Sequence, residues 1–204
     1  MADARERLLG AAMEYVAEHG VSDLSLRGLA PALGTSHRML IYHFGSKNGL
    51  LTAIVQAVEE GQRALFAGLA ADLEADPAGF AHRYWRQLTD PEMRTRERLF
   101  FDVYVRALHG APGTEALLGG GVEPWLELLT SWLERLGTPR TVARPRARLA
   151  LAASRGLLLD LAATGDRAAV DAAMDAFIDL VKPVAGAPVP GPDHRRDQGC
   201  PGAG

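Results

Sequence analysis

The chain of 204 residues has a single cysteine, Cys200, and only two lysines, Lys47 and Lys182. One cysteine excludes an internal disulfide bond and a cysteine-based zinc cluster. No apolar run reaches the roughly 18–20 residues that a membrane-spanning helix requires, and no charged start leads into an apolar stretch typical of a signal peptide. We therefore expect a soluble, cytoplasmic protein that uses no metal or other cofactor.

Acidic residues are missing from one long segment. Residues 24–58 contain no aspartate or glutamate, although the chain has 25 of them and a net charge of −3. The same segment holds five basic side chains, namely Arg27, His37, Arg38, His43 and Lys47. The lack of carboxylates removes repulsion from phosphate groups, so the segment is a candidate for binding nucleic acid. The alternative is an ordinary solvated stretch between two helices of a bundle.

The hydrophobic pattern predicts an all-α protein. Apolar residues recur at spacings of three and four, and no segment alternates with a period of two. Ser25 is expected to cap a short helix that runs to about Leu33, and Thr35 or Ser36 to cap another that runs to about Phe44. A turn at residue 34 joins them. Two short helices joined by a tight turn form a helix-turn-helix, whose second helix enters the DNA major groove.

Proline and glycine mark the boundaries of the later helices. Asp76 and Asp90 each precede a proline, which is typical of a helix start. Residues 139 and 145, both proline, are expected to delimit the start of the penultimate helix. We place an N-terminal DNA-binding domain at residues 1–50, with the motif at about 25–44, and a helical ligand-binding and dimerisation domain at 51–182. Residues 183–204 are rich in proline and glycine and are predicted to be disordered.

The string LSLRGLAPALGTSHRMLIYHFGSKNGLL resembles the N-terminal DNA-binding domain of TetR-family transcriptional regulators. The resemblance covers roughly residues 5–55 and rests on a specific pattern of residues. The matching positions are Ser25, Leu29-Ala30, Gly34, Thr35-Ser36, Tyr42-His43-Phe44, Lys47 and Leu50-Leu51. Ile41 departs from the pattern, because the family usually has tyrosine there, and Pro31 lies inside the second helix, where it removes a backbone donor.

The resemblance and the chemistry of the side chains together give roles in DNA binding. The residues that open the recognition helix, and so reach base edges, are Thr35, Ser36, His37, Arg38 and Met39. Arg38 is the best candidate for a guanine contact, since it can donate two hydrogen bonds. The candidates for phosphate contacts are Arg27, Tyr42, His43 and Lys47, and for Arg27 the alternative is a base at the edge of the site. For Tyr42 and His43 the alternative is a structural role, in which the aromatic pair holds the third helix against the first.

The last two helices are expected to form a dimer interface. The candidate residues are Leu149, Ala153, Gly156 and Leu157 in the penultimate helix, and Val170, Met174, Phe177, Ile178 and Val181 in the last. Small residues allow helices to approach closely, and two such pairs build a four-helix bundle across a two-fold axis. The alternative is that both helices pack only within the monomer. Three aspartates in the last helix, four residues apart, are typical of a solvated face rather than a metal site.

The middle of the chain is a candidate ligand chamber. An apolar helix near residues 99–108 is expected to be buried on nearly all sides. The candidate ligand-binding residues are Trp85, Phe101, Asp102, Tyr104, Arg106 and Trp125. Asp102 and Arg106 are either polar anchors in the pocket or a simple ion pair.

The sequence thus predicts a homodimeric regulator of transcription, which we expect to be a repressor. It would bind a palindromic double-stranded DNA operator and leave it when a small apolar or amphipathic molecule binds. One alternative is an enzyme built on a helical bundle, but the sequence has no phosphate-binding loop, nucleophile elbow or other catalytic motif, and we assign no catalytic residue. Another is a helical interaction protein that has lost DNA binding.

Overall fold

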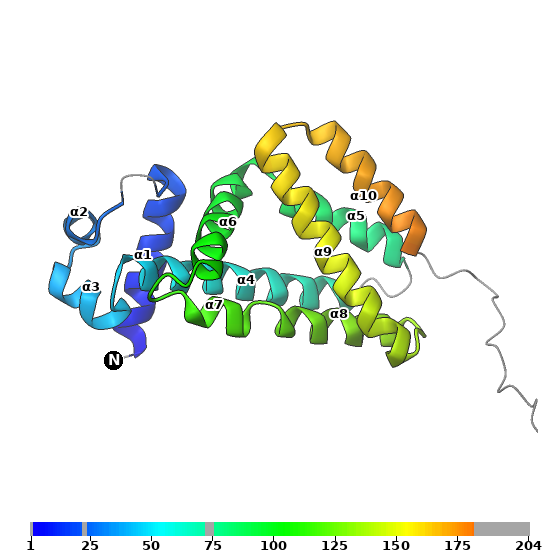
Figure 1. The fold of residues 1–204 in the computed structure, drawn as a ribbon, viewed down its shortest axis with the longest axis horizontal. Helices are drawn as coiled ribbons and strands as arrows, with labels where there is room; N and C mark the ends of the chain where they lie inside the picture. Colours follow the sequence, from blue (N-terminus) through cyan, green and yellow to red (C-terminus); the bar gives the residue numbers. More distant parts are fainter. Residues whose placement is uncertain (1, 22–23, 72–75, 182–204) are drawn as a thin grey trace, which may run out of the picture.

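The fold is known from a computed structural model that describes residues 2–21, 24–71 and 76–181. Over these ranges the chain is helical and contains no strand, as expected (Figure 1). The helices are α1 (Ala2–His19), α2 (Leu26–Ala32), α3 (His37–Phe44), α4 (Lys47–Ala71), α5 (Pro77–Leu88), the 3-10 helix η1 (Pro91–Met93), α6 (Arg94–Leu108), α7 (Glu115–Gly120), α8 (Glu123–Arg135), α9 (Arg140–Thr164) and α10 (Arg167–Val181).

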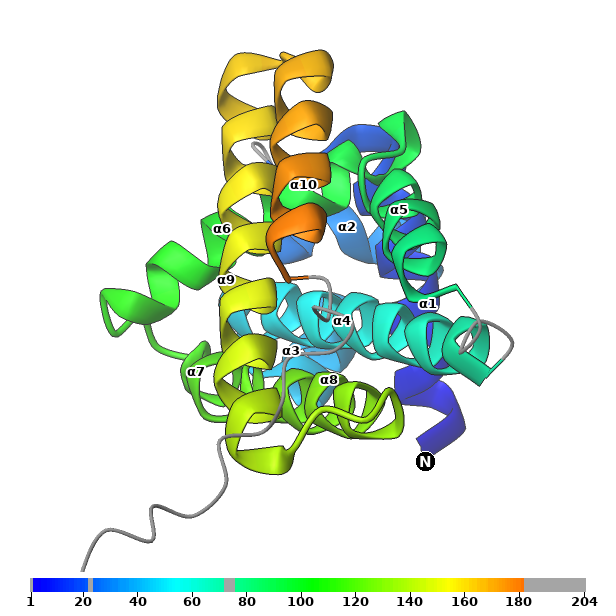
Figure 2. The same ribbon diagram turned by 90° about the vertical axis from the view of Figure 1, so that its right-hand side faces the viewer.

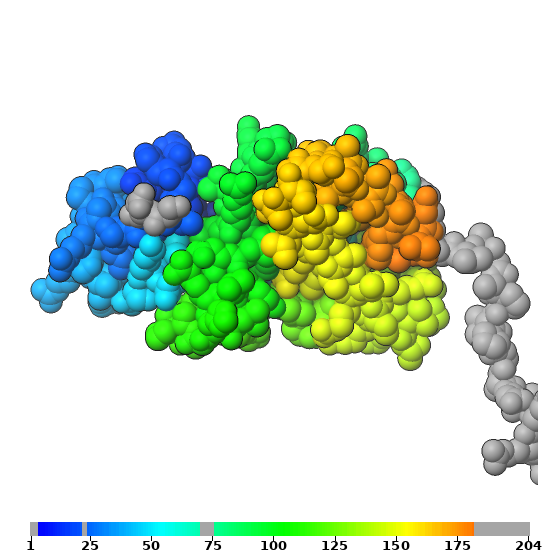
Figure 3. All heavy atoms as spheres, turned by 45° about the horizontal axis from the view of Figure 1, so that its top comes forward, coloured from blue at the N-terminus to red at the C-terminus, as the bar shows by residue number. Residues whose placement is uncertain are grey.

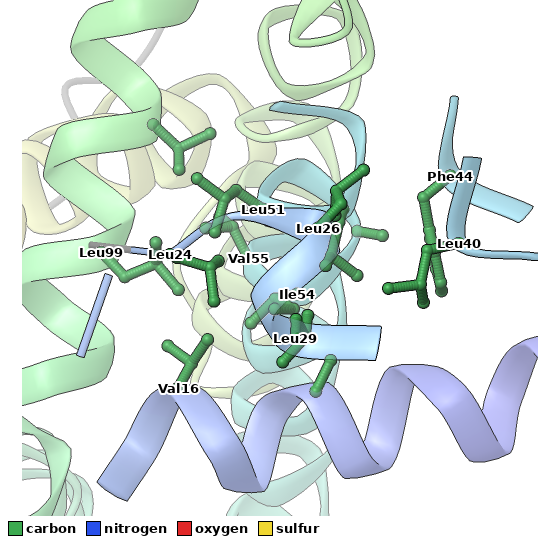
Figure 4. Close-up of a cluster of buried hydrophobic side chains, with 14 of the residues drawn as sticks. Val16, Leu24, Leu26, Leu29, Leu40, Phe44, Leu51, Ile54, Val55 and Leu99 are labelled. Atoms are coloured by element: carbon green, nitrogen blue, oxygen red, sulfur yellow. The ribbon is translucent and has the colours of Figure 1, made fainter. Parts of the chain in front are cut away.

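Helices α1, α2 and α3 form a small unit at one end of the molecule, against the start of α4 (Figure 1). Its core consists of apolar side chains from each of these helices and from α6 and α7. Val16 of α1, Leu29 of α2 and Ile54 of α4 point toward one another there (Figure 4). Leu40 and Phe44 are also buried, so α3 is attached to the unit through one side.

The boundaries of α2 and α3 follow from capping chemistry. The Ser25 hydroxyl accepts a hydrogen bond from the Gly28 amide at 3.1 Å, and the Ser36 hydroxyl accepts one from the Met39 amide at 3.3 Å. Gly45 ends α3 with a φ of 73°, a conformation that side chains with a Cβ rarely adopt. The predicted caps at residues 25 and 36 are confirmed. Pro31 lies within α2, which nevertheless continues to Ala32.

Helix α4 connects the small unit to the rest of the molecule. It begins at Lys47, beside α3, passes below α6 and continues to Ala71 (Figure 1). The predicted domain boundary at residue 50 therefore falls inside a continuous helix. Leu50 and Leu51 belong to the core of the small unit, whereas Phe66 belongs to a second core in the body.

The body is built from α5 to α10, with α9 and α10 side by side (Figure 2). Polar contacts attach α10 to α5: the Trp85 indole donates to Asp171 at 2.7 Å, and His82 lies 3.0 Å from an Asp175 oxygen. Asp171 and Asp175 of α10 therefore contact side chains of α5. None of the described helices combines the length and apolar character that crossing a membrane would require.

One predicted helix boundary and one prediction of burial need correction. Pro145 does not mark the start of the penultimate helix, because α9 begins at Arg140 and continues through Pro145. Helix α6 is not surrounded by protein, since Val105 and Leu108 are exposed. The predicted disordered tail lies outside the described residues.

Candidate nucleic-acid interface and internal cavity

One side of α3 forms an exposed surface without carboxylates. Leu40 and Phe44, four residues apart, are buried, and this turns His37, Arg38, Met39, Ile41 and Tyr42 outward. Tyr42 is 65% exposed. Ser36 and Arg27 are exposed nearby, and Thr35 is half-buried at the turn. The predicted contact residues at the start of α3 thus lie together on one accessible surface, the α3 face, which we define as residues 36–39, 41 and 42.

His43 is different from its neighbours. Its ring lies 5.0 Å from the Tyr42 ring, edge to face, and 6.3 Å from the Phe44 ring. Its Nε2 atom is enclosed and has no hydrogen-bond partner among the described residues. An enclosed nitrogen cannot reach a phosphate without a rearrangement. This geometry favours the structural alternative for His43, in which the ring packs beside α3.

Lys47 lies in the first turn of α4, next to the end of α3. The turn is fixed by the Ser46 hydroxyl, which accepts a hydrogen bond from the Gly49 amide at 3.0 Å. It is also held from the body, because the Asn48 side-chain amide donates to the Pro112 carbonyl at 3.2 Å. The loop of residues 109–114, between α6 and α7, thus packs on the start of α4.

The body contains an apolar cavity of about 200 Å³ enclosed by α4, α5, α6, α8, α9 and α10. Aromatic side chains form a large part of its apolar wall, and they include the predicted Trp85, Phe101 and Trp125. Phe66 lies at their centre, with ring centroids 4.8 Å from Phe80 and 5.1 Å from Tyr84, both edge to face. The walls are therefore suited to an apolar or aromatic molecule.

The other predicted ligand residues lie elsewhere. Asp102 and Arg106 form an ion pair, with 3.1 Å between Oδ2 and Nε, and their side chains are 41% and 42% exposed. Neither residue lines the cavity, so the ion-pair alternative is correct and the assignment as pocket anchors is wrong. Tyr104 is not in the wall either; its ring stacks on Phe100 at 5.5 Å.

Polar side chains gather at one part of the cavity wall. Arg155 of α9 donates to Glu59 of α4 at 2.8 Å and to the Gly121 carbonyl at 3.0 Å. Gln62 of α4 donates to Glu97 of α6 at 3.2 Å. We call Glu59, Gln62, Glu97 and Arg155 the polar cluster.

Burial changes the acidity of both carboxyl groups in the polar cluster. Removal from water raises the pKa of Glu97 to about 7, and the neighbouring Glu59 charge acts in the same direction. Burial also raises the pKa of Glu59, although the positive charges of Arg155 and Arg63 oppose this. Both carboxyl groups thus pay a desolvation penalty, but only Glu59 has a direct guanidinium partner.

The sequence analysis missed the polar cluster, although a signal existed for part of it. Glu59 follows the buried Val55 by four residues, so a charged residue falls on the apolar stripe of α4. Arg155 is the one charged residue in the stretch from residue 149 to 159. Nothing in the sequence pairs the two, because they lie 96 residues apart.

The structure revises the predicted dimer interface. Val170, Met174 and Ile178 are buried in the core of the same protomer, where they pack with α5 and α9, so they cannot cover a partner. Ala153, Leu157, Phe177 and Val181 are only partly exposed, whereas Leu149 and Gly156 are exposed.

A different stripe of α9 and α10 faces outward. Its exposed members recur at spacings of three and four, and they are Leu149, Ala152, Gly156, Leu159 and Ala163 on α9 and Ala169, Ala173, Ala176 and Leu180 on α10. Leu149 and Leu159 are 54% and 51% exposed. The two helices form one continuous surface in the space-filling view (Figure 3). We call this set the α9–α10 face.

Comparison with known proteins relates the first helices to one family. Residues 8–54 match the sequence model of the family described as bacterial regulatory proteins, tetR family. This range contains α2, α3 and the exposed α3 face. No curated protein is similar enough in sequence to match the chain.

Solved structures resemble the whole chain. A TetR-family transcriptional regulator from Pectobacterium atrosepticum is 21% identical, with a TM-score of 0.69, and the match covers 89% of this chain and 93% of that one. A transcriptional regulator from Rhodococcus sp. Rha1 is 22% identical, with a TM-score of 0.68, covering 87% and 95%. The multidrug binding protein EbrR complexed with ethidium is 24% identical, with a TM-score of 0.66, covering 87% and 97%. The segment of residues 8–54 therefore belongs to the tetR family of bacterial regulatory proteins, and the chain has the fold of TetR-family transcriptional regulators.

Proposed function

We propose that the chain is a cytoplasmic, homodimeric regulator of transcription that binds DNA and represses, and that a small apolar or amphipathic molecule releases it. The observation that carries the proposal is the α3 face. Arg38 and its neighbours are exposed there, while Leu40 and Phe44 fix the helix from behind. Binding rather than catalysis is the activity that this arrangement supports.

The side chains of the α3 face suit the two kinds of contact that DNA offers. The Arg38 guanidinium can donate two parallel hydrogen bonds to a guanine, and His37 and Ser36 can reach base edges or phosphates beside it. Tyr42 of this face, together with Arg27 and Lys47, suits phosphate contacts, which fix the position of the protein without reading sequence. The segment of residues 24–58 offers no carboxylate that would repel the duplex.

Two copies of the chain would join through the α9–α10 face. Alanine and glycine on this face allow close approach, and the leucines supply apolar area at the centre. Two-fold symmetry places the same surface on both subunits and presents two α3 faces to DNA. Recognition helices about 34–36 Å apart read successive major grooves, so the operator is a palindrome.

Helix α4 supplies the connection between the cavity and the α3 face. Lys47 and Glu59 lie 12 residues apart in sequence, which at 1.5 Å per residue is about 18 Å along one continuous helix. A molecule that displaces Glu59 or Phe66 therefore acts on the element that carries the phosphate-binding turn. A coupling of about 1–3 kcal/mol would lower operator affinity roughly 5- to 150-fold.

Selection of binding sites from random DNA duplexes tests this function. The purified chain is expected to enrich an inverted repeat whose half-sites are centred about 10 base pairs apart, one helical turn. Arg38→Ala, carried through the same selection, should lose preference at one position of each half-site. Enrichment of no sequence by the unmodified chain would contradict the proposal and favour the interaction protein that does not bind DNA.

A further inference from the structure

The charge balance of the polar cluster is uneven. Arg155 compensates Glu59, and its guanidinium is further occupied by the Gly121 carbonyl and by the Phe100 ring, 5.0 Å away. Glu97 receives one hydrogen bond, from the neutral amide of Gln62, and the described residues offer its carboxylate no ion pair. A carboxylate in such a position is costly unless a positive charge reaches it.

Glu97 also lies at a junction between two spaces. A second hollow of about 210 Å³ lies between the end of α5, the start of α6 and the end of α9. Leu88, Glu97 and Leu158 line both this hollow and the aromatic cavity. The Glu97 side chain therefore borders both spaces.

The aromatic wall, like Glu97, favours a positive charge on the ligand. The faces of phenyl and indole rings are electronegative and attract cations within about 6 Å. Arg63 already lies 5.8 Å from the Trp125 ring, and Arg155 lies over Phe100. The wall can thus receive the positive group of a ligand as well as its apolar body.

Among the positive side chains of the cavity wall, Arg155 is the one that acts on the charge of Glu97, and it is already hydrogen-bonded to Glu59. Arg96 is exposed and contacts the Met93 sulfur at 3.4 Å. Arg146 precedes Arg155 by nine residues of α9, which places it about 13 Å along the helix from the polar cluster. The polar cluster thus holds two carboxyl groups and a single guanidinium, that of Arg155.

We propose that Glu97 selects the ligand of the cavity, which is an amphipathic cation whose ammonium-type group pairs with the Glu97 carboxylate while its apolar body lies against the aromatic wall. This inference rests on the proposed function, because it names the ligand class of the same cavity. Gln62 positions the carboxylate, and Glu59 adds negative potential from α4.

The proposal includes a dependence on pH. The groups that face Glu97 are Glu59 and Gln62 from α4, Arg155 from α9 and Tyr84 from α5. On its own helix, Arg94, Arg96 and Arg98 are exposed. Burial raises the pKa of Glu97 to about 7, so the carboxyl group is mostly neutral at pH 6 and mostly ionised at pH 8. Affinity for a cation should thus rise about tenfold between these values, whereas affinity for a neutral analogue should not.

Three probes of the same size test the charge preference: 2-naphthylmethylamine, 2-naphthylmethanol and 2-naphthoate. Each is titrated into the purified full chain without DNA and followed by quenching of tryptophan fluorescence, since Trp85, Trp125 and Trp132 line the cavity. At pH 8 the ammonium compound should bind at least tenfold more tightly than the alcohol. Glu97→Gln should abolish this preference and leave the affinity for the alcohol within about twofold. Glu60→Gln removes an exposed acid of α4 and serves as the control. It should change neither the preference for the ammonium probe nor the affinity for the alcohol.

The outcomes separate this inference from the proposed function. Equal binding of the ammonium and alcohol probes at pH 8, or tightest binding of the naphthoate, would overturn the inference alone. If none of the three probes bound, both this inference and the proposed release by a ligand would be wrong. The proposed DNA binding would stand, because the selection of sites from random duplexes measures it independently. If Glu97→Gln did not fold, the pH series on the unmodified chain would decide: ammonium affinity that stays constant from pH 6 to 8 contradicts the role of Glu97.

Discussion

The hydroxyl of Thr52, in the second turn of α4, donates a hydrogen bond to the carbonyl of Gly113 at 3.0 Å. Gly113 lies so close to α4 that a Cβ atom there would meet the Ser46 hydroxyl at 2.9 Å. Its φ of 86° also favours glycine. The loop after α6 is thus fitted against the turn that carries Lys47, and we expect a movement of α6 to reach that turn through this loop.

This contact predicts the effect of Thr52→Val. Valine keeps the shape of the side chain but removes a hydrogen bond worth about 0.5–1.5 kcal/mol. We expect the release of operator DNA by saturating 2-naphthylmethylamine to weaken about two- to tenfold, while operator affinity without the probe changes little. Fluorescence anisotropy with and without the probe measures this ratio. Thr141→Val, at an exposed position of α9, is the control, and equal effects of the two variants would refute the role of the loop.

Arg38 and Lys47 are predicted to act differently on DNA. Arg38→Ala should cost about 1–3 kcal/mol of operator binding and relax the preference at one base position, because it removes a base contact. Lys47→Ala should weaken binding to all sequences similarly and reduce the slope of log K against log salt by about 1, because it removes a phosphate contact. Competition titrations at several salt concentrations distinguish the two. If both variants lost affinity without any change in sequence preference, Arg38 would not read a base.

The stability of the protein should depend on pH through Glu97. Its folded pKa of about 7 lies above the ordinary value of 4.5, so the folded state binds the proton more tightly than the unfolded state. The resulting stabilisation is complete below pH 4.5 and is lost as the pH rises through 7; it amounts to at most about 3 kcal/mol. Urea unfolding at pH 5 and pH 8 should therefore show a larger loss of stability for the unmodified chain than for Glu97→Gln. Equal losses would mean that Glu97 is not desolvated.

Two leucine-to-acid substitutions test the α9–α10 face. Leu159→Glu should convert the dimer to a monomer in sedimentation velocity and weaken operator binding, with little change in unfolding free energy, since the side chain is already half exposed. Leu65→Glu, at an exposed position of α4, should leave the dimer intact. A dimer that survives Leu159→Glu would place the interface elsewhere.

Ile178 should behave in the opposite way to Leu159. It is buried within the protomer, so Ile178→Ala should lower the unfolding free energy by about 2–5 kcal/mol through loss of core packing. Urea unfolding measures this loss. A negligible change would show that α10 does not contribute to the core of the protomer.

Local chemistry made the small N-terminal unit predictable. Ser25 and Ser36 cap their helices as expected, and Leu29, Leu40 and Phe44 lie in the core of the unit that these caps delimit. These features depend on residues a few positions apart, so the sequence contains the necessary information.

Contacts between distant parts of the chain were less predictable. The apolar stripe of Val170, Met174 and Ile178 predicts burial, but a stripe that packs inside a protomer has the same pattern as one that covers a partner. Nor does any local signal bring Glu59 and Arg155 together across 96 residues. Likewise Asp102 and Arg106 have the spacing of an ion pair, and only the structure shows that the cavity lies on the other side of α6.

The central claim is that the carboxylate-free α3 face binds DNA, and binding to DNA from upstream of the gene that encodes the chain tests it most directly. Anisotropy titration with a labelled duplex, at salt concentrations from 50 to 200 mM, gives affinity and salt slope together. We predict binding that unlabelled random DNA does not readily displace, with affinity falling steeply as salt rises. Weak binding that random DNA competes away equally well, and that Arg38→Ala leaves unchanged, would contradict the account.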